Sequence, residues 1–145
     1  MGDVDVADLF RRAVAEDDAA AMREGLERML GLVDGGGLSP EREYELRCPD
    51  FVMEMPQSGE RIRGRDDMRR MQESFPGGGP AFTLRRVVGC GRVWVAEADG
   101  RYGEDHWQVV TILELAADGR IARETRYYPQ PFDAPDWRGG LTERM

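Results

Sequence analysis

Three side chains able to hold a ligand alternate near the end of the run RIARETRYY, residues 120–128. Glu124, Arg126 and Tyr128 are two residues apart, so a β-strand would place all three on one face. A neighbouring arginine lowers the pKa of a carboxyl group while burial raises it, so the pair leaves an ionised carboxylate and a fixed cation. Arg126 can then hold a ligand oxyanion while Tyr128 donates to a carbonyl. With a general base nearby, this set suits proton abstraction next to a carbonyl, as in enolisation or aldol cyclisation.

Two other residues can move the proton. In the run RVWVAEA, residues 92–98, Glu97 shares a strand face with Val93 and Val95. We expect that face to point inward, which makes Glu97 a second glutamate of the site. His106 is the single histidine of the chain and is a candidate general acid or base. The predicted catalytic residues are therefore Glu124, Glu97 and His106.

Each catalytic candidate also has a structural interpretation. The glutamates suit ion pairs with strand arginines such as Arg85 or Arg86, or exposed positions near a turn. His106, beside Asp105, suits a solvated hairpin. Candidates for substrate binding line the same predicted pocket, and the methionines and the tryptophan among them equally suit core packing. These binding candidates are Met55, Met53, Thr111, Arg126, Tyr128 and Trp107.

Several cofactor classes are excluded by composition. All 20 basic residues are arginine, which rules out a Schiff-base lysine, a covalent pyridoxal phosphate site and a P-loop lysine. One histidine cannot build a His-rich zinc site, and Cys48 and Cys90 lack metal-ligand spacing. The glycines of GCG, residues 89–91, lead into a predicted strand, whereas a dinucleotide site needs a helix there. We therefore expect no cofactor and no metal.

Length and charge narrow the class of protein further. The 145 residues, with 41% hydrophobic and 33% charged, suit one globular domain over residues 1–145. A net charge of −8 argues against binding to nucleic acid or to an anionic membrane surface. The acidic start MGDVDVADLF does not resemble a signal peptide, and no apolar run approaches the roughly 18 residues of a membrane span. We expect a cytoplasmic protein.

The predicted elements place helices first and strands later. Apolar stripes predict helices over 6–14 and 22–33, and Ser39 with Pro40 begins a short helix that Pro49 ends. A strand over 51–57 and a helix over 66–75 follow. Alternating or β-branched runs then predict further strands, the last three as an antiparallel meander, and a Pro-rich tail at 129–145 that covers a surface. These strands span 82–89, 92–98, 106–115 and 120–128. The order predicts an α+β fold whose curved sheet encloses a pocket.

Three segments carry a resemblance to a known family. They are PDFVMEMPQSGERIRGRDDMRRM (49–71), RVWVAEADGRYGEDHWQVVTILEL (92–115) and GRIARETRYYPQPFDAPDWR (119–138). With the N-terminal helices they resemble the nuclear transport factor 2-like superfamily, in its SnoaL-like and ketosteroid-isomerase-like branches. The resemblance implies a conical α+β barrel with helices on a strongly curved, mostly antiparallel sheet, a pocket inside, and a homodimer through the outer sheet face. It also implies that Ala122, Glu124, Arg126, Tyr128 and Thr111 point inward.

The same resemblance shows where this chain departs from ketosteroid isomerases. Met55 stands where those enzymes carry a carboxylate base, and Phe10 and Thr111 stand near the places of their two oxyanion donors. SnoaL-type cyclases use an Asp/His pair, and here only His106 is available. We therefore expect a cofactor-free isomerase or cyclase whose catalytic groups lie on another wall of the pocket. Its expected substrate is a hydrophobic, oxygenated, polyketide-like molecule. The alternatives are a non-catalytic ligand-binding protein and a dimerisation module of the same fold.

Overall fold

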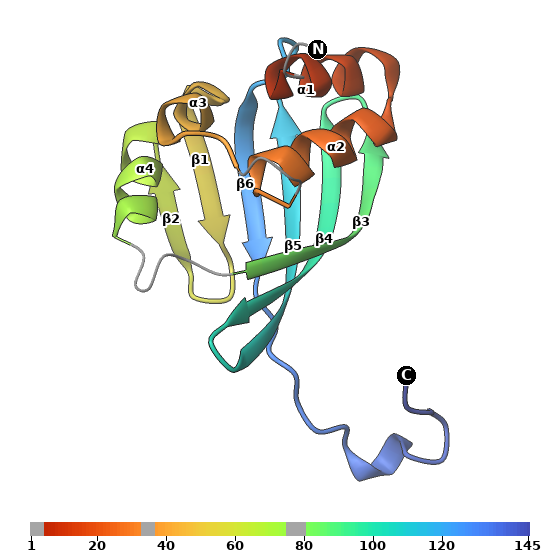
Figure 1. The fold of residues 1–145 in the computed structure, drawn as a ribbon. Helices are drawn as coiled ribbons and strands as arrows, with labels where there is room; N and C mark the ends of the chain where they lie inside the picture. Colours follow the sequence, from red (N-terminus) through yellow and green to blue (C-terminus); the bar gives the residue numbers. More distant parts are fainter. Residues whose placement is uncertain (1–4, 33–36, 75–80) are drawn as a thin grey trace.

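The computed structural model describes residues 5–32, 37–74 and 81–145 (Figure 1). Helices cover one side of a six-stranded sheet whose order is β2-β1-β6-β5-β4-β3. All neighbours are antiparallel except β1 and β6, which are parallel. The elements are α1 (Val6–Glu16), α2 (Ala19–Met29), α3 (Pro40–Glu45), β1 (Arg47–Met55), β2 (Glu60–Arg63), α4 (Arg65–Glu73), β3 (Ala81–Cys90), β4 (Val93–Tyr102), β5 (Asp105–Leu115), β6 (Ile121–Tyr127) and the 3-10 helix η2 (Asp136–Arg138). The predicted α+β class is confirmed, although the curved sheet stays open between its edges β2 and β3.

The first two helices bury the apolar stripes that predicted them. Phe10 of α1 and Met22 of α2 are fully buried in the core. Gly25 lets the helices approach closely, since a Cβ there would lie 2.6 Å from the Phe10 ring. Arg23 ties α2 to the sheet by donating from Nη2 to the Leu84 carbonyl of β3 at 3.0 Å. Phe10, which the resemblance places near an oxyanion donor of ketosteroid isomerases, is therefore a core side chain here.

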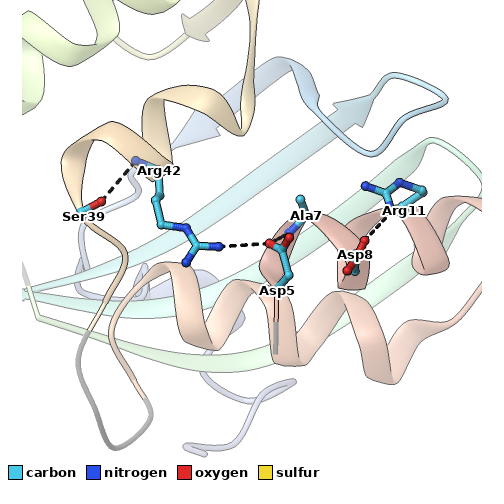
Figure 2. A network of polar contacts seen from close by, with 6 residues as sticks. All are labelled: Asp5, Ala7, Asp8, Arg11, Ser39 and Arg42. Atoms are coloured by element: carbon cyan, nitrogen blue, oxygen red, sulfur yellow. Dashed lines mark hydrogen bonds and ion pairs between the residues drawn. The ribbon is translucent and has the colours of Figure 1, made fainter. Parts of the chain in front are cut away.

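Caps and charged contacts fix α3 against its neighbours. Asp5 caps α1 by accepting from the Ala7 amide at 3.0 Å, and it also accepts from Arg42 of α3 at 3.3 Å (Figure 2). Ser39 caps α3 by accepting from the Arg42 amide at 3.3 Å, as predicted. The Tyr44 hydroxyl donates to Asp66 of α4 at 2.6 Å. Helix α3 is thus tied to both α1 and α4.

Strand pairing in this region differs from the prediction at Pro49 and at residues 60–63. Pro49 does not end a helix but lies inside β1, which begins at Arg47. The run ERIR, for which no strand was predicted, forms strand β2 and pairs with β1, with Met55 opposite Glu60. Pro49 is tolerated because the ladder between β1 and β6 is irregular between Arg47 and Val52, so the missing N–H of proline breaks no regular pairing there.

Rows of side chains cross the inner face of the sheet. In one row, Trp94, Leu113, Glu124 and Met53 are cross-strand neighbours and all are buried. In the next row, Ala96 lies beside Thr111 and Thr111 beside Arg126. The inward directions expected for Thr111, Glu124 and Arg126 are confirmed. Ala122 is only partly buried, because an irregularity in the ladder pairs Leu115 with Ile121, and Ile121 is fully buried instead.

The C-terminal tail does not cover the sheet. Figure 1 shows it leaving the lower end of β6 and running away from the body of the molecule. Phe132, Trp137 and Leu141 are 79%, 76% and 83% exposed, so the expectation of a covering tail is wrong. Within the described residues, no helix has the length and apolar character needed to cross a bilayer.

Candidate functional site: a pocket with a held arginine

A pocket of about 1020 Å³ opens beside the inner face of the sheet. Such a volume is that of a small-molecule site. Its apolar lining comes from helices and strands alike: Met29, Leu30, Met55, Met71, Phe82, Ala96, Ala98, Trp107 and Val109. Its polar lining consists of Glu43, Gln57, Ser58, Glu60, Gln72, Asp105, Thr111, Arg126, Tyr128 and Gln130. Apolar side chains form most of the pocket surface, and ten polar or charged residues interrupt it.

Arg126 reaches the pocket and is held from behind by Glu124. Its Nε and Nη2 lie 2.8 Å and 2.5 Å from Glu124 Oε2. The Glu124 side chain is 1% exposed and that of Arg126 is 22% exposed. Both guanidinium contacts fall on a single carboxylate oxygen, so Glu124 fixes the direction of Arg126. Glu124 does not itself line the pocket.

The pKa values of Glu124 and Arg126 are set more by their charged neighbours than by burial. Burial alone raises the pKa of Glu124, but the nearby charges of Arg126 and Arg47 outweigh it, so its pKa is lowered. Burial likewise works to lower the pKa of Arg126, yet the charge of Glu124 and the neighbouring Tyr128 raise it overall. Arg126 is therefore a permanent cation in the pocket wall. Glu124 stays ionised and is a weak base.

A second arginine extends this network from the sheet to helices α3 and α4. Arg47 is 2% exposed, and its Nη2 lies 3.8 Å from Glu124 Oε1 and 3.2 Å from Glu43 Oε1. Gln72 of α4 also donates to Glu43 Oε1, at 2.6 Å. The connected series Gln72, Glu43, Arg47, Glu124 and Arg126 begins and ends with residues that line the pocket. The polar groups of two walls are thus fixed by one buried set of contacts.

The structure brings most of the predicted binding residues together. Met55, Thr111, Trp107, Tyr128 and Arg126 all line the pocket. Met53 does not, because it lies in the buried row beside Glu124 and is 0% exposed. The prediction that Met53 contacts a ligand is therefore wrong, and that side chain belongs to the core.

Two catalytic candidates lie off the pocket. Glu97 points to the outer face, since Ala96 and Ala98 line the pocket, and it accepts from Arg86 Nη2 at 2.6 Å. The prediction that Glu97 faces inward is wrong by one strand position, which reverses the face. His106 is half exposed, lies 3.7 Å from Asp99, and does not line the pocket. It occupies the β4–β5 hairpin, whereas its neighbour Trp107 points inward.

Sequence reasoning missed Glu43, a carboxylate of the pocket wall. It lies in the short helix α3, which was recognised only for its cap. The usable signal was the spacing of Glu43 and Arg47, four residues apart, although Arg47 itself lies just beyond the helix. Among the residues that the structure describes, no cluster of three or more His, Cys, Asp or Glu side chains is arranged to hold a metal ion.

A curved sheet, helices on one face and an apolar pocket between them define the nuclear transport factor 2-like class of folds. The chain belongs to the SnoaL-like domain family, whose model matches residues 45–124. The predicted branch of the superfamily is thereby confirmed. A comparison with curated proteins gave no match.

Solved structures agree with this assignment. The chain is similar to an NTF-2 like protein of unknown function from Burkholderia xenovorans LB400, with 30% identity, TM-score 0.68, and coverage of 85% of this chain and 94% of that one. It is similar to a putative ketosteroid isomerase from Kribbella flavida, with 27% identity, TM-score 0.74, and coverage of 94% and 90%. A steroid delta-isomerase from Pseudomonas aeruginosa, with 21% identity, TM-score 0.60 and coverage of 77% and 79%, shares the fold.

Proposed function

We propose that the chain is a cofactor-free isomerase or cyclase that acts by general acid–base chemistry on a hydrophobic, oxygenated small molecule. The observation that carries this proposal is Arg126, a cation held at 2.8 Å by a buried glutamate while it lines an apolar pocket. An oriented cation in a water-poor site stabilises an oxyanion strongly, because it needs no reorganisation when the charge develops. The similarity to a putative ketosteroid isomerase supports the same class of chemistry.

Arg126 and Tyr128 together form the proposed oxyanion site. Both line the pocket, and they are two residues apart at the end of β6 and just beyond it. A ketone oxygen placed between them would gain negative charge on enolisation, and both side chains can donate to it. Ala96 and Ala98 leave room over this part of the sheet, so the body of a ring system has space beside the two donors.

The proposal is tested by ligand binding and turnover with a panel of aromatic ketones. Arg126→Lys keeps the positive charge but loses the planar fork, so we expect weaker binding and slower turnover. Arg86→Lys makes the same change on the outer face and serves as the matched control. If Arg126→Lys binds and turns over the ketones as well as Arg86→Lys does, Arg126 does not hold the ligand.

A non-catalytic ligand-binding protein is the second candidate. Its support is the lowered pKa of Glu124, where the charges of Arg126 and Arg47 outweigh the effect of burial, since this removes the most buried carboxylate as a base. Under this alternative the ketones bind at Arg126 without turnover. Measuring ketone binding and turnover on the same samples separates the enzyme from the non-catalytic binding protein.

We also propose a homodimer that forms through the outer sheet face. Val93, Val88 and Tyr127 are 51%, 46% and 37% exposed, and the cross-strand register places them on the face opposite the pocket. Exposed apolar groups on one sheet face are typical of an association surface. Sedimentation equilibrium should give a dimer that Val93→Arg weakens, and a wild-type monomer at all concentrations would contradict the proposal.

The cytoplasmic location expected from the sequence stays a prediction.

A further inference from the structure

We infer that Glu43 is the general base of this pocket, an assignment that rests on the proposed enzymatic function. Glu43 lines the pocket from α3, and its side chain is 22% exposed. A base must reach the proton that it removes, and Glu43 meets this requirement because it borders the chamber itself. None of the catalytic residues predicted from the sequence does so.

The contacts of Glu43 favour one of its two oxygens for chemistry. Gln72 Nε2 lies 2.6 Å and Arg47 Nη2 lies 3.2 Å from Oε1. Within residues 5–32, 37–74 and 81–145, no donor bonds to Oε2. Two donors on one oxygen orient the carboxylate, while the second oxygen keeps its lone pairs for a proton. This is an arrangement for a fixed acceptor at a pocket wall.

The helix that carries Glu43 is itself held in place. Tyr44 donates to Asp66 at 2.6 Å, and the Arg65 guanidinium stacks over the Tyr44 ring at 4.1 Å. Helix α4, which supplies Asp66, also supplies Gln72. The position of the carboxylate is therefore set by two helices that contact each other, which is what a positioned base requires.

The other carboxylates near the pocket suit this role less well. Glu60 and Asp105 line the pocket but are exposed, so water competes for them. Glu124 lies behind Arg126 and is bonded to it through Oε2. Among the described lining residues, Glu43 alone combines a place in the wall with partial burial and two side-chain donors.

The step balances without any cofactor. Glu43 Oε2 takes a proton from the carbon next to the ketone carbonyl, and the C–H electron pair becomes the C=C bond of an enolate. The carbonyl electron pair moves to oxygen, where Arg126 and Tyr128 hold the charge. With a β,γ-unsaturated ketone the enolate is a dienolate, and isomerisation ends when Glu43 returns the proton to its γ carbon while the oxygen electron pair re-forms the carbonyl. Cyclisation ends when the enolate carbon attacks a second carbonyl and the proton passes to the resulting alkoxide.

The test is hydrogen–deuterium exchange at the carbon next to the carbonyl of 2-tetralone, followed by proton NMR in D₂O. We expect Glu43→Gln to lower the protein-catalysed exchange rate by about 100-fold or more, the range that general-base catalysis supplies. Its dissociation constant for 2-tetralone should stay close to that of the wild type. Glu41→Gln changes an exposed residue of the same helix, bound to Arg69 outside the pocket, and should exchange at the wild-type rate.

Two outcomes separate this inference from the proposed function. Exchange by Glu43→Gln within about threefold of the wild type, far short of a general-base effect, overturns Glu43 as the base and leaves the enzyme proposal standing. A wild-type protein that binds 2-tetralone without exchange overturns the proposed catalysis and the base together. Glu43→Asp covers the case in which the glutamine variant does not fold, because it keeps the charge opposite Arg47. Because its carboxylate is set back, Glu43→Asp should catalyse the exchange of 2-tetralone more slowly than the wild type. An unchanged exchange rate in Glu43→Asp also overturns the inference.

Discussion

Two glutamate–arginine pairs lie on opposite faces of the same sheet. On the inner face, Glu124 holds Arg126 with a closest contact of 2.5 Å and side-chain exposures of 1% and 22%. On the outer face, Glu97 holds Arg86 at 2.6 Å, with exposures of 34% and 63%. The two pairs have the same residue types and nearly equal distances, and they differ in how far their side chains are exposed to solvent.

That difference decides what each pair can do. A buried charge pair loses hydration on both groups, so it persists only with good geometry and further partners, and Arg47 is such a partner for Glu124. An exposed pair is screened by water and salt and contributes little. The comparison also explains the role of Glu124: the contacts that make it permanently charged turn it from a candidate base into a support for Arg126.

The largest expected effect is on stability at the inner pair. Glu124→Gln should lower the free energy of unfolding by about 3 kcal/mol, because removing one partner leaves buried arginine charge uncompensated. Urea unfolding followed by circular dichroism measures this. A loss in Glu124→Gln as small as that in the outer-face variant Glu97→Gln would show that burial does not separate the two pairs.

A smaller effect on the free energy of unfolding is expected when the pH is lowered. Burial raises the pKa of Glu124, yet the charges of Arg126 and Arg47 lower it overall, so its contribution to stability is present above the unfolded value, about 4.3. That contribution is lost as the pH falls through the lower folded pKa. The difference in unfolding free energy between wild type and Glu124→Gln should therefore shrink as the pH drops from 5 to 3. A difference that stays constant over this range would contradict the assignment.

The smallest effect is expected at the outer pair. Glu97→Gln should leave the urea midpoint at its wild-type value in 0.5 M salt, because screening already weakens an exposed pair. Turnover should also be unaffected, since Glu97 lies on the face away from the pocket. A loss of turnover in Glu97→Gln with an unchanged midpoint would restore Glu97 as a functional residue.

Much of the fold was predictable because its signals are local. The stripe that includes Phe10 predicted α1, and Ser39 with Pro40 predicted the start of α3. Strand β2 was missed because four residues rich in arginine carry no apolar alternation, and it forms only by pairing with β1. At Ala122 a ladder irregularity interrupts the simple alternation, and such an irregularity is a property of two strands and not of one.

The candidate site was predictable in part. Arg126 and Tyr128 alternate on a strand, so their shared face followed from the sequence. Glu97 was placed on the wrong face because both faces of β4 carry apolar residues, so its alternation does not say which face is inside. Glu43 was missed because its only local signal, an arginine four residues later, does not say that the side chain reaches a pocket.

The sequence by itself determined the α+β order, the family, the absence of lysine chemistry and the alternation of Glu124, Arg126 and Tyr128. These follow from composition and from side-chain periods of two or 3.6 residues, which depend on near neighbours alone. Only the tertiary structure decided that Glu124 is a support, that Glu97 is on the outside and that Glu43 lines the pocket. The physical reason is that solvent access and charge pairing depend on contacts that α3 and β1 make with α4 and β6, which lie farther along the chain.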